Sequence, residues 1–146
     1  MKPTMNANVL AFDFGTQRIG VAVGNSLVRI AQPLVTIAAD AATMMAMIGA
    51  LVDEWQPHAL VVGLPRHADG TPHAMTAKTE RFAEALRDRF KLPVALVDER
   101  WTTELAQSQL NRERRGRAGR KDRDEIAAQL ILQAYFDEQN GNTGNS

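Results

Sequence analysis

The chain has 146 residues, of which 45% are hydrophobic, and its 17 basic and 17 acidic residues leave no net charge at pH 7. This length and composition fit one soluble domain, 1–146, and no apolar run is long enough to cross a bilayer. The absence of cysteine excludes disulfides, thiol nucleophiles and cysteine-ligated zinc. Residues 1–8 form an expected flexible tail without the apolar segment of a signal peptide, so we expect a cytoplasmic protein that does not bind membranes.

A β-hairpin is predicted at Val9 to Gly24, where two apolar runs flank a short polar connection. The first run is apolar at every position except Asp13. A carboxylate in a buried strand is costly unless it is paired, and its partner could be an arginine, backbone amides or a metal ion. Alternatively, Asp13 caps the turn, where aspartate is common.

The next part of the chain alternates strands and helices. We expect, in order, a strand at Leu27 to Ala38, a helix from Asp40 to Trp55, a strand at Ala59 to Pro65, a helix from Thr71 to Phe90 and a strand at Val94 to Val97. Pro33 is tolerated if the first of these strands lies at a sheet edge. Strand-helix-strand order with short connections requires right-handed parallel crossovers. The fold class is therefore α/β, with a mixed five-stranded sheet of three antiparallel and then two parallel strands, flanked by helices.

Two acids, Asp98 and Glu99, follow the last predicted strand. Side chains alternate along a strand, so only one of these acids can lie on the same face as Asp13. An exposed strand end, in which Glu99 pairs with Arg100 or caps a following helix, is an equally good interpretation.

Residues 112–123 are predicted to form a mobile basic loop with two glycines and almost nothing apolar. Between Asn111 and Arg123, basic residues outnumber acidic ones seven to two. Arginine dominates over lysine there, which favours forked contacts with phosphates. The alternative is a solvated run of charge without a partner.

The final helix is predicted at Asp124 to Phe136, followed by a flexible polar tail, 137–146. Asp124 shares a helical stripe with apolar residues such as Ala128 and Ile131, so this face can pack on the sheet. Asp122 is expected to belong to the loop. Asp124 could also act only as a helix cap.

Asp13, Glu99 and Asp124 thus form a trio of acids, each at the polar end of an otherwise buried element. Oxygen ligands in such a cluster suit Mg²⁺ or Mn²⁺ better than zinc.

Four short motifs occur in this order: Asp13-Phe14-Gly15-Thr16 with Arg18-Ile19-Gly20-Val21-Ala22, Gly63-Leu64-Pro65 with Asp69-Gly70, Asp98-Glu99-Arg100 with Thr102-Thr103, and Asp124 with Ile126-Ala127-Ala128. Together they resemble the YqgF/RuvX family, whose members are described as pre-16S rRNA nucleases and Holliday-junction-resolvase-like proteins with an RNase H-like fold. The resemblance covers residues 9–136. It departs mildly from the family at Trp101 and at Arg66-His67.

The resemblance implies that Asp13, Glu99 and Asp124 are the catalytic residues and hold a divalent metal, Mg²⁺ or Mn²⁺. We expect a metal-dependent endonuclease that hydrolyses phosphodiester bonds in structured RNA, at the 5′ end of precursor 16S rRNA. The cations expected to contact substrate phosphates are Arg18, Arg114, Arg115, Arg117, Arg120 and Lys121.

Three other functions are suggested by parts of the sequence. A Holliday-junction resolvase acting on branched DNA would use the same acids and usually works as a dimer, and a homodimer is compatible with the sequence. An ATP-binding module of the actin and sugar-kinase type needs two such domains and a longer chain. A non-catalytic nucleic-acid-binding regulator would keep the basic loop but has no need of three convergent acids.

Overall fold

The computed structural model describes residues 7–65, 69–71, 73–99 and 120–144 of the chain. Within these ranges the backbone forms β1 (Asn8–Phe14), β2 (Arg18–Asn25), β3 (Ile30–Ala38), α1 (Met44–Trp55), β4 (Ala59–Leu64), α2 (Thr76–Phe90), β5 (Val94–Asp98) and α4 (Arg120–Gly144). None of the helices in these ranges is long and apolar enough to span a membrane.

The five strands form one sheet in the order β3-β2-β1-β4-β5. β1 pairs antiparallel with β2, and β2 with β3, whereas β4 runs parallel to β1 and β5 parallel to β4. The predicted mixed sheet is therefore confirmed. Pro33 lies in β3, an edge strand of the sheet, where the missing N–H is tolerated.

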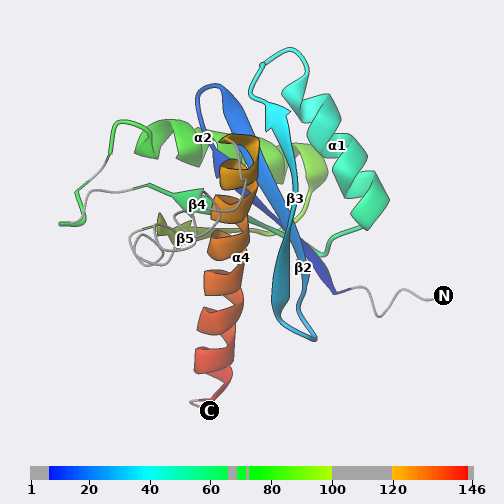
Figure 1. The fold of residues 1–146 in the computed structure, drawn as a ribbon, viewed down its shortest axis with the longest axis vertical. Helices are drawn as coiled ribbons and strands as arrows, with labels where there is room; N and C mark the ends of the chain where they lie inside the picture. The colour runs from blue at the N-terminus through cyan, green and yellow to red at the C-terminus, as the bar shows by residue number, and fades with distance from the viewer. Residues whose placement is uncertain (1–6, 66–68, 72, 100–119, 145–146) are drawn as a thin grey trace.

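Alternate side chains of β1 enter two different cores. Leu10 and Phe12 pack with residues of α1 and α2, whereas Val9 and Ala11 pack with residues of α4. In Figure 1, α4 (orange to red) crosses in front of the sheet, α2 (green) passes behind its upper end and α1 (cyan) lies to the right, beyond β3. Asp13 belongs by this alternation to the face covered by α4.

Helix α4 lies close against β2 because two β2 residues on its side are glycines. A Cβ on Gly20 would lie 2.0 Å from the backbone oxygen of Asp124, and one on Gly24 would lie 2.7 Å from Cε2 of Phe136. Ala22, between the two glycines, is fully buried in the same core. This row of small residues lets the backbone of α4 approach the strand, and it brings Asp124 to the start of β2.

Helix α4 is longer at both ends than the predicted Asp124 to Phe136. It begins at Arg120, inside the segment predicted as a basic loop, and it continues to Gly144, through most of the predicted flexible tail. Phe136 is the last buried apolar residue of the helix. The apolar periodicity marks the part of the helix that packs on the sheet, and the backbone hydrogen bonds extend beyond it.

Helix α1 begins at Met44, later than the predicted cap at Asp40. The Asp40 carboxylate accepts a hydrogen bond from the backbone N–H of Ala42 at 3.1 Å, and its carbonyl oxygen accepts one from Met44 at 2.8 Å. Asp40 therefore closes a turn ahead of the helix instead of capping it.

Helix α2 also begins later than predicted, at Thr76 and not at Thr71. The Thr71 hydroxyl donates to the Asp69 carboxylate at 2.7 Å, which closes a local turn. The buried Thr76 hydroxyl donates to the carbonyl oxygen of Pro65 at 2.5 Å and accepts from the backbone N–H of His73 at 2.7 Å. These bonds fasten the start of α2 to the end of β4.

Candidate active site

Asp13 is the last residue of β1 that faces α4. It pairs in register with Gly20 of β2, and the preceding residues on its face, Val9 and Ala11, are fully buried. Asp13 itself is partly buried, where this apolar row reaches the end of the strand. The alternation of the strand therefore carries a carboxyl group to the edge of the core beneath α4.

Glu99 directly follows β5 and lies on the same face of the sheet as Asp13. Val97, two residues earlier, is buried in the core beneath α4. A Cβ on Gly63 of β4 would lie 2.7 Å from Oε2 of Glu99, so the absence of a side chain there makes room for the carboxylate. Glu99 is also hydrogen-bonded to Asp13. The sequence left open whether Asp98 or Glu99 joins Asp13, and the structure brings Glu99 to it.

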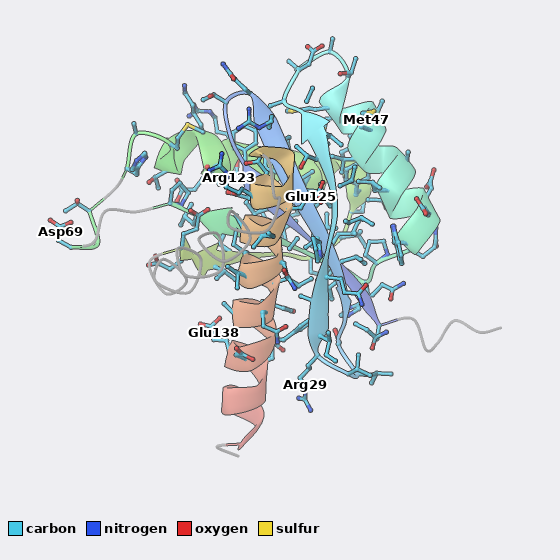
Figure 2. All side chains as sticks on the ribbon, viewed as in Figure 1. Arg29, Met47, Asp69, Arg123, Glu125 and Glu138 are labelled. Carbon is cyan, nitrogen blue, oxygen red and sulfur yellow. The ribbon has the colours of Figure 1, made fainter. Side chains whose placement is uncertain are left out.

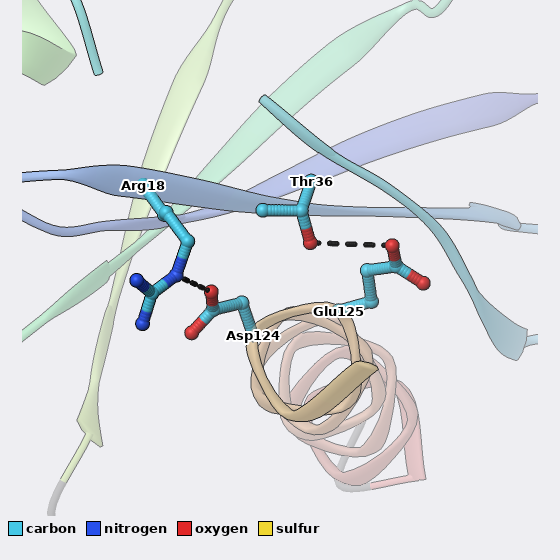
Figure 3. A network of polar contacts seen from close by, with 4 residues as sticks. All are labelled: Arg18, Thr36, Asp124 and Glu125. Atoms are coloured by element: carbon cyan, nitrogen blue, oxygen red, sulfur yellow. Dashed lines mark hydrogen bonds and ion pairs between the residues drawn. The ribbon is translucent and has the colours of Figure 1, made fainter. Parts of the chain in front are cut away.

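Asp124 enters the site from α4, and an ion pair holds its carboxylate. Nε of Arg18 donates to Oδ2 of Asp124 at 2.5 Å. The next residue, Glu125, accepts a hydrogen bond from the Thr36 hydroxyl at 3.2 Å. Figure 3 shows both contacts above the end of the helix. Together they tie the beginning of α4 to β2 and β3.

Burial and neighbouring carboxyl groups change the ionisation of Asp13 and Glu99. The pKa of Asp13 is raised from 3.8 to about 8, first by burial and then by the negative charges of Glu99 and Asp124. Burial also raises the pKa of Glu99, while the hydrogen bond with Asp13 acts in the opposite direction. A hydrogen bond donated by protonated Asp13 to the Glu99 carboxylate raises the pKa of Asp13 and lowers the pKa of Glu99. Ionisation of Asp13 near neutral pH, beside the charges of its neighbours, therefore requires additional positive charge.

A cleft of about 240 Å³ opens beside these acids. The residues that line it come from the end of β1, the following turn, the start of β2 and α4. They are Asp13, Gly15, Thr16, Gln17, Arg18 and Asp124. The backbone N–H of Gly15 donates to the carbonyl oxygen of Arg18 at 3.0 Å, which closes the turn between β1 and β2. Carboxylates and one guanidinium thus border a space that is open to a substrate.

The family model of RuvX, described as Holliday junction resolvase, matches residues 7–138. The chain belongs to the RuvX family. Two bacterial relatives carry the name "putative pre-16S rRNA nuclease". The protein of Nitrosospira multiformis is 50% identical over 136 residues, which cover 92% of this chain and 90% of the relative. The protein of Burkholderia vietnamiensis is 52% identical over 136 residues, which cover 91% of each.

The fold of this RuvX chain is also found among solved structures. RuvC of Thermus thermophilus, solved in complex with a Holliday junction substrate, aligns with a TM-score of 0.62 at 15% identity, over 92% of this chain and 96% of RuvC. At that identity the likeness concerns the fold alone. The predicted family and RNase H-like fold class are confirmed, and this RuvX chain is a hydrolase of the nuclease type.

The acids of this RuvX chain fit a divalent cation in their chemistry. Carboxylate oxygens are ligands that Mg²⁺ and Mn²⁺ prefer. Burial, and then the negative charges of Glu99 and Asp124, raise the pKa of Asp13, and a bound cation would oppose both effects. Across the described ranges, however, no three His, Asp or Glu side chains are arranged to hold a metal ion. Asp124 is paired with Arg18, and Asp13 is hydrogen-bonded to Glu99. The acids converge, but their carboxylates are engaged with other partners.

The predicted phosphate-binding cations are placed unequally. Arg18 lines the cleft, bound to Asp124. Arg120 and Lys121 belong to the first turn of α4, where only the backbone is described. The remaining three, Arg114, Arg115 and Arg117, lie outside the described residues.

Two glycines that position the site were not singled out from the sequence. Gly20 admits the backbone of Asp124, and Gly63 admits the carboxylate of Glu99. Glycine inside a strand signals a close approach by another part of the molecule, so the signal was present in both apolar runs. The glycines do not indicate which residue approaches them, because that residue is distant in the sequence.

We expect Gly20→Ala to move the start of α4 away from β2 and to impair cleavage. The new Cβ would meet backbone atoms of Asp124 at 2.0 and 2.4 Å, which cannot be relieved by rotating a side chain. Overpacking of this kind destabilises by about 1–3 kcal/mol. Gly49→Ala is the control, because the nearest atom to its Cβ is at 3.6 Å and Ala is favoured in a helix. Melting temperature and cleavage rate measure the difference, and equal values for both variants would contradict the close packing.

Proposed function

We propose that this chain is a metal-dependent endonuclease acting on structured RNA, and that it matures the 5′ end of precursor 16S rRNA in the cytoplasm. The observation that carries the proposal is the convergence of Asp13, Glu99 and Asp124 at a cleft that Asp13 and Asp124 line. Burial there, together with the negative charges of Glu99 and Asp124, raises the pKa of Asp13. Such clusters of perturbed acids are typical of functional sites. The names of the relatives support precursor rRNA as the substrate.

Each acid has a role in this proposal. Asp13 interacts electrostatically with both other acids, so it would hold a divalent ion together with Glu99 and Asp124. A bound Mg²⁺ or Mn²⁺ lowers the pKa of a water nucleophile and neutralises charge on the phosphate and the leaving oxygen. Arg18 borders the same cleft, and its guanidinium can contact a substrate phosphate once Asp124 has another cation.

The basic segment supplies the remaining phosphate contacts in this proposal. Its cations are Arg114, Arg115, Arg117, Arg120 and Lys121. Arg120 and Lys121 stand one turn before Asp124 in α4, so the segment leads directly to the acids. Contacts to phosphate position a strand without reading its sequence.

Cleavage of four-way DNA junctions is the second candidate function. The description of the matching family model and the RuvC-like fold favour it. The same three acids would serve, and a homodimer would be needed to cut two strands. The candidates therefore differ in substrate and assembly and share the chemistry.

Three labelled substrates test the proposal: a 16S rRNA precursor with a 5′ extension, a four-way DNA junction and generic single strands. Each is incubated with Mg²⁺, Mn²⁺, Ca²⁺ or chelator, and Asp13→Asn protein purified in parallel is the control. We expect cleavage of the precursor with Mg²⁺ or Mn²⁺ and none with chelator. Cleavage of the junction alone would favour the second candidate. No cleavage of any substrate with any metal would overturn the nuclease proposal.

A further inference from the structure

A second cavity, of about 310 Å³, lies on the other side of the turn between β1 and β2. Gly15 and Thr16 line both this cavity and the cleft beside the acids. Phe14 also lines it, and because side chains alternate along β1, Phe14 faces α2 where its neighbour Asp13 faces α4. The two spaces are thus separated only by the turn.

Most residues that line this cavity are apolar, and one of them, Phe14, is held by a stacked neighbour. The ring of Phe14 stacks on Phe82, with centroids 4.4 Å apart and planes 19° apart, and Phe82 is itself buried. Met44, at the start of α1, and Met75, just before α2, supply polarisable side chains on other sides. Methionine and phenylalanine both make favourable contacts with flat aromatic rings.

Of the described residues that line the cavity, Lys78 is the one that carries a charge. Its side chain is exposed, and within the described ranges it forms no ion pair. Apolar walls with a single exposed ammonium group match a nucleotide, which carries a flat base next to a phosphate. The volume is also at the lower end of the roughly 300–1,000 Å³ found for small-ligand pockets.

We propose that this cavity takes one unpaired nucleobase of the substrate strand, placed against Phe14, Met44 and Met75, while Lys78 contacts an adjoining phosphate. The inference rests on the proposed function and extends it, because a strand that crosses the Gly15–Thr16 turn reaches both the cavity and the acids. A base within a duplex cannot enter, so the cavity selects strands that are unpaired or easily opened near the cleavage site.

The lining also predicts what the cavity does not select. Among the described residues, Thr16 and Lys78 are the only polar side chains that line it. Discrimination between bases needs paired donors and acceptors directed at a base edge, whereas stacking accepts every base. We therefore expect a requirement for an unpaired nucleotide at a fixed distance from the cleaved bond, with little preference for its identity.

Oligoribonucleotides that carry 2-aminopurine at successive positions test the proposal, because this base changes fluorescence when it stacks. Binding is measured in chelator, so that no strand is cut. Ala41 lines the cavity at an exposed position, and Ala41→Leu fills the space without disturbing the core. Ala46→Leu, exposed on α1 away from the cavity, is the matched control.

With wild type and Ala46→Leu we expect a fluorescence change at one or two adjacent positions. With Ala41→Leu this change should be lost and binding weakened about fivefold or more, as for loss of one stacked base. Lys78→Ala should weaken binding and lower the slope of log affinity against log salt by about one phosphate contact. Arg89→Ala, which removes another exposed cation of α2, should leave the slope unchanged.

Failure of this inference is distinguishable from failure of the proposed function. If wild type binds none of the RNA strands in chelator and cleaves none when Mg²⁺ or Mn²⁺ is added, the proposed function fails and the inference with it. If wild type binds RNA but no position responds, or if Ala41→Leu matches Ala46→Leu, the cavity is not a base-binding site and the nuclease proposal stands.

Discussion

Asp13→Asn is expected to abolish cleavage while making the metal-free protein more stable. Loss of one well-placed electrostatic group in an active site lowers the rate by about 10²-fold or more. In the absence of metal, Asp13 is a partly buried acid facing two others. The asparagine amide can donate to Glu99 as the protonated carboxyl does, without the cost of ionisation.

The gain in stability should depend on pH in a defined direction. The pKa of Asp13 is about 8 in the folded protein against 3.8 ordinarily, so the folded state binds more protons between these pH values. The contribution of Asp13 to stability therefore falls as pH rises through this window, and asparagine removes the fall. We expect a stability difference near zero at pH 4, rising to about 1–3 kcal/mol at pH 8.

Thermal melts in chelator from pH 4 to 8 measure this difference. With about 2–4 °C for each kcal/mol, the variant should melt roughly 3–10 °C above wild type at pH 8. Saturating Mg²⁺ should raise the melting temperature of wild type more than that of the variant. A variant that cleaves at the wild-type rate, or a wild type that gains no stability from Mg²⁺, would contradict the metal-site proposal.

The strand pattern predicted much of this fold because its signals are local. The apolar run around Asp13 indicated a buried strand with an acid in it, and Pro33 indicated an edge strand, as the structure has them. The choice between Asp98 and Glu99 is not local. It depends on which face of the sheet α4 covers. The packing of α4 over Gly63 and its neighbours identifies that face, and this packing joins residues distant in sequence.

The contacts of Arg18 illustrate the other limit of sequence reasoning. Its place in a short motif indicated a cation near Asp13, and we assigned it to substrate phosphates. The structure pairs it with Asp124, a residue 106 positions away. Local patterns cannot reveal such a partner, because the approach of α4 to β2 depends on the absence of a side chain at Gly20.

Helix α4 begins earlier than predicted, because charged residues that indicate a loop belong to its first turn. Asp122, expected in that loop, lies inside the helix, one residue after Lys121. Arginine, lysine and glutamate favour helices nearly as well as leucine, so a stretch without apolar residues can still be helical. What the apolar stripe did predict is the packed face, which includes Ala128 and Ile131.

Asp124→Asn and Asp122→Asn are expected to differ strongly in their effect on cleavage, although each removes one carboxylate from the same end of α4. Residues two apart in a helix lie about 200° apart around its axis. Figure 2 shows this for Arg123 and Glu125, which lie on opposite sides of α4. Asp124 contacts Arg18 beside the cleft, and the backbone of α4 places position 122 on another side of the helix.

Single-turnover cleavage at saturating Mg²⁺ measures the difference. Asp124→Asn should lower the rate by about 10²-fold or more, whereas Asp122→Asn should leave it nearly unchanged. Stability should separate the variants poorly, since the Arg18–Asp124 pair is partly exposed and worth about 0–1 kcal/mol, and an acid near a helix start contributes about 0.3–1 kcal/mol. An inactive Asp122→Asn with an active Asp124→Asn would contradict the assignment of Asp124 as the third metal ligand. Because the two variants lose the same charge at nearly the same place, a general electrostatic effect on substrate binding would lower both rates alike.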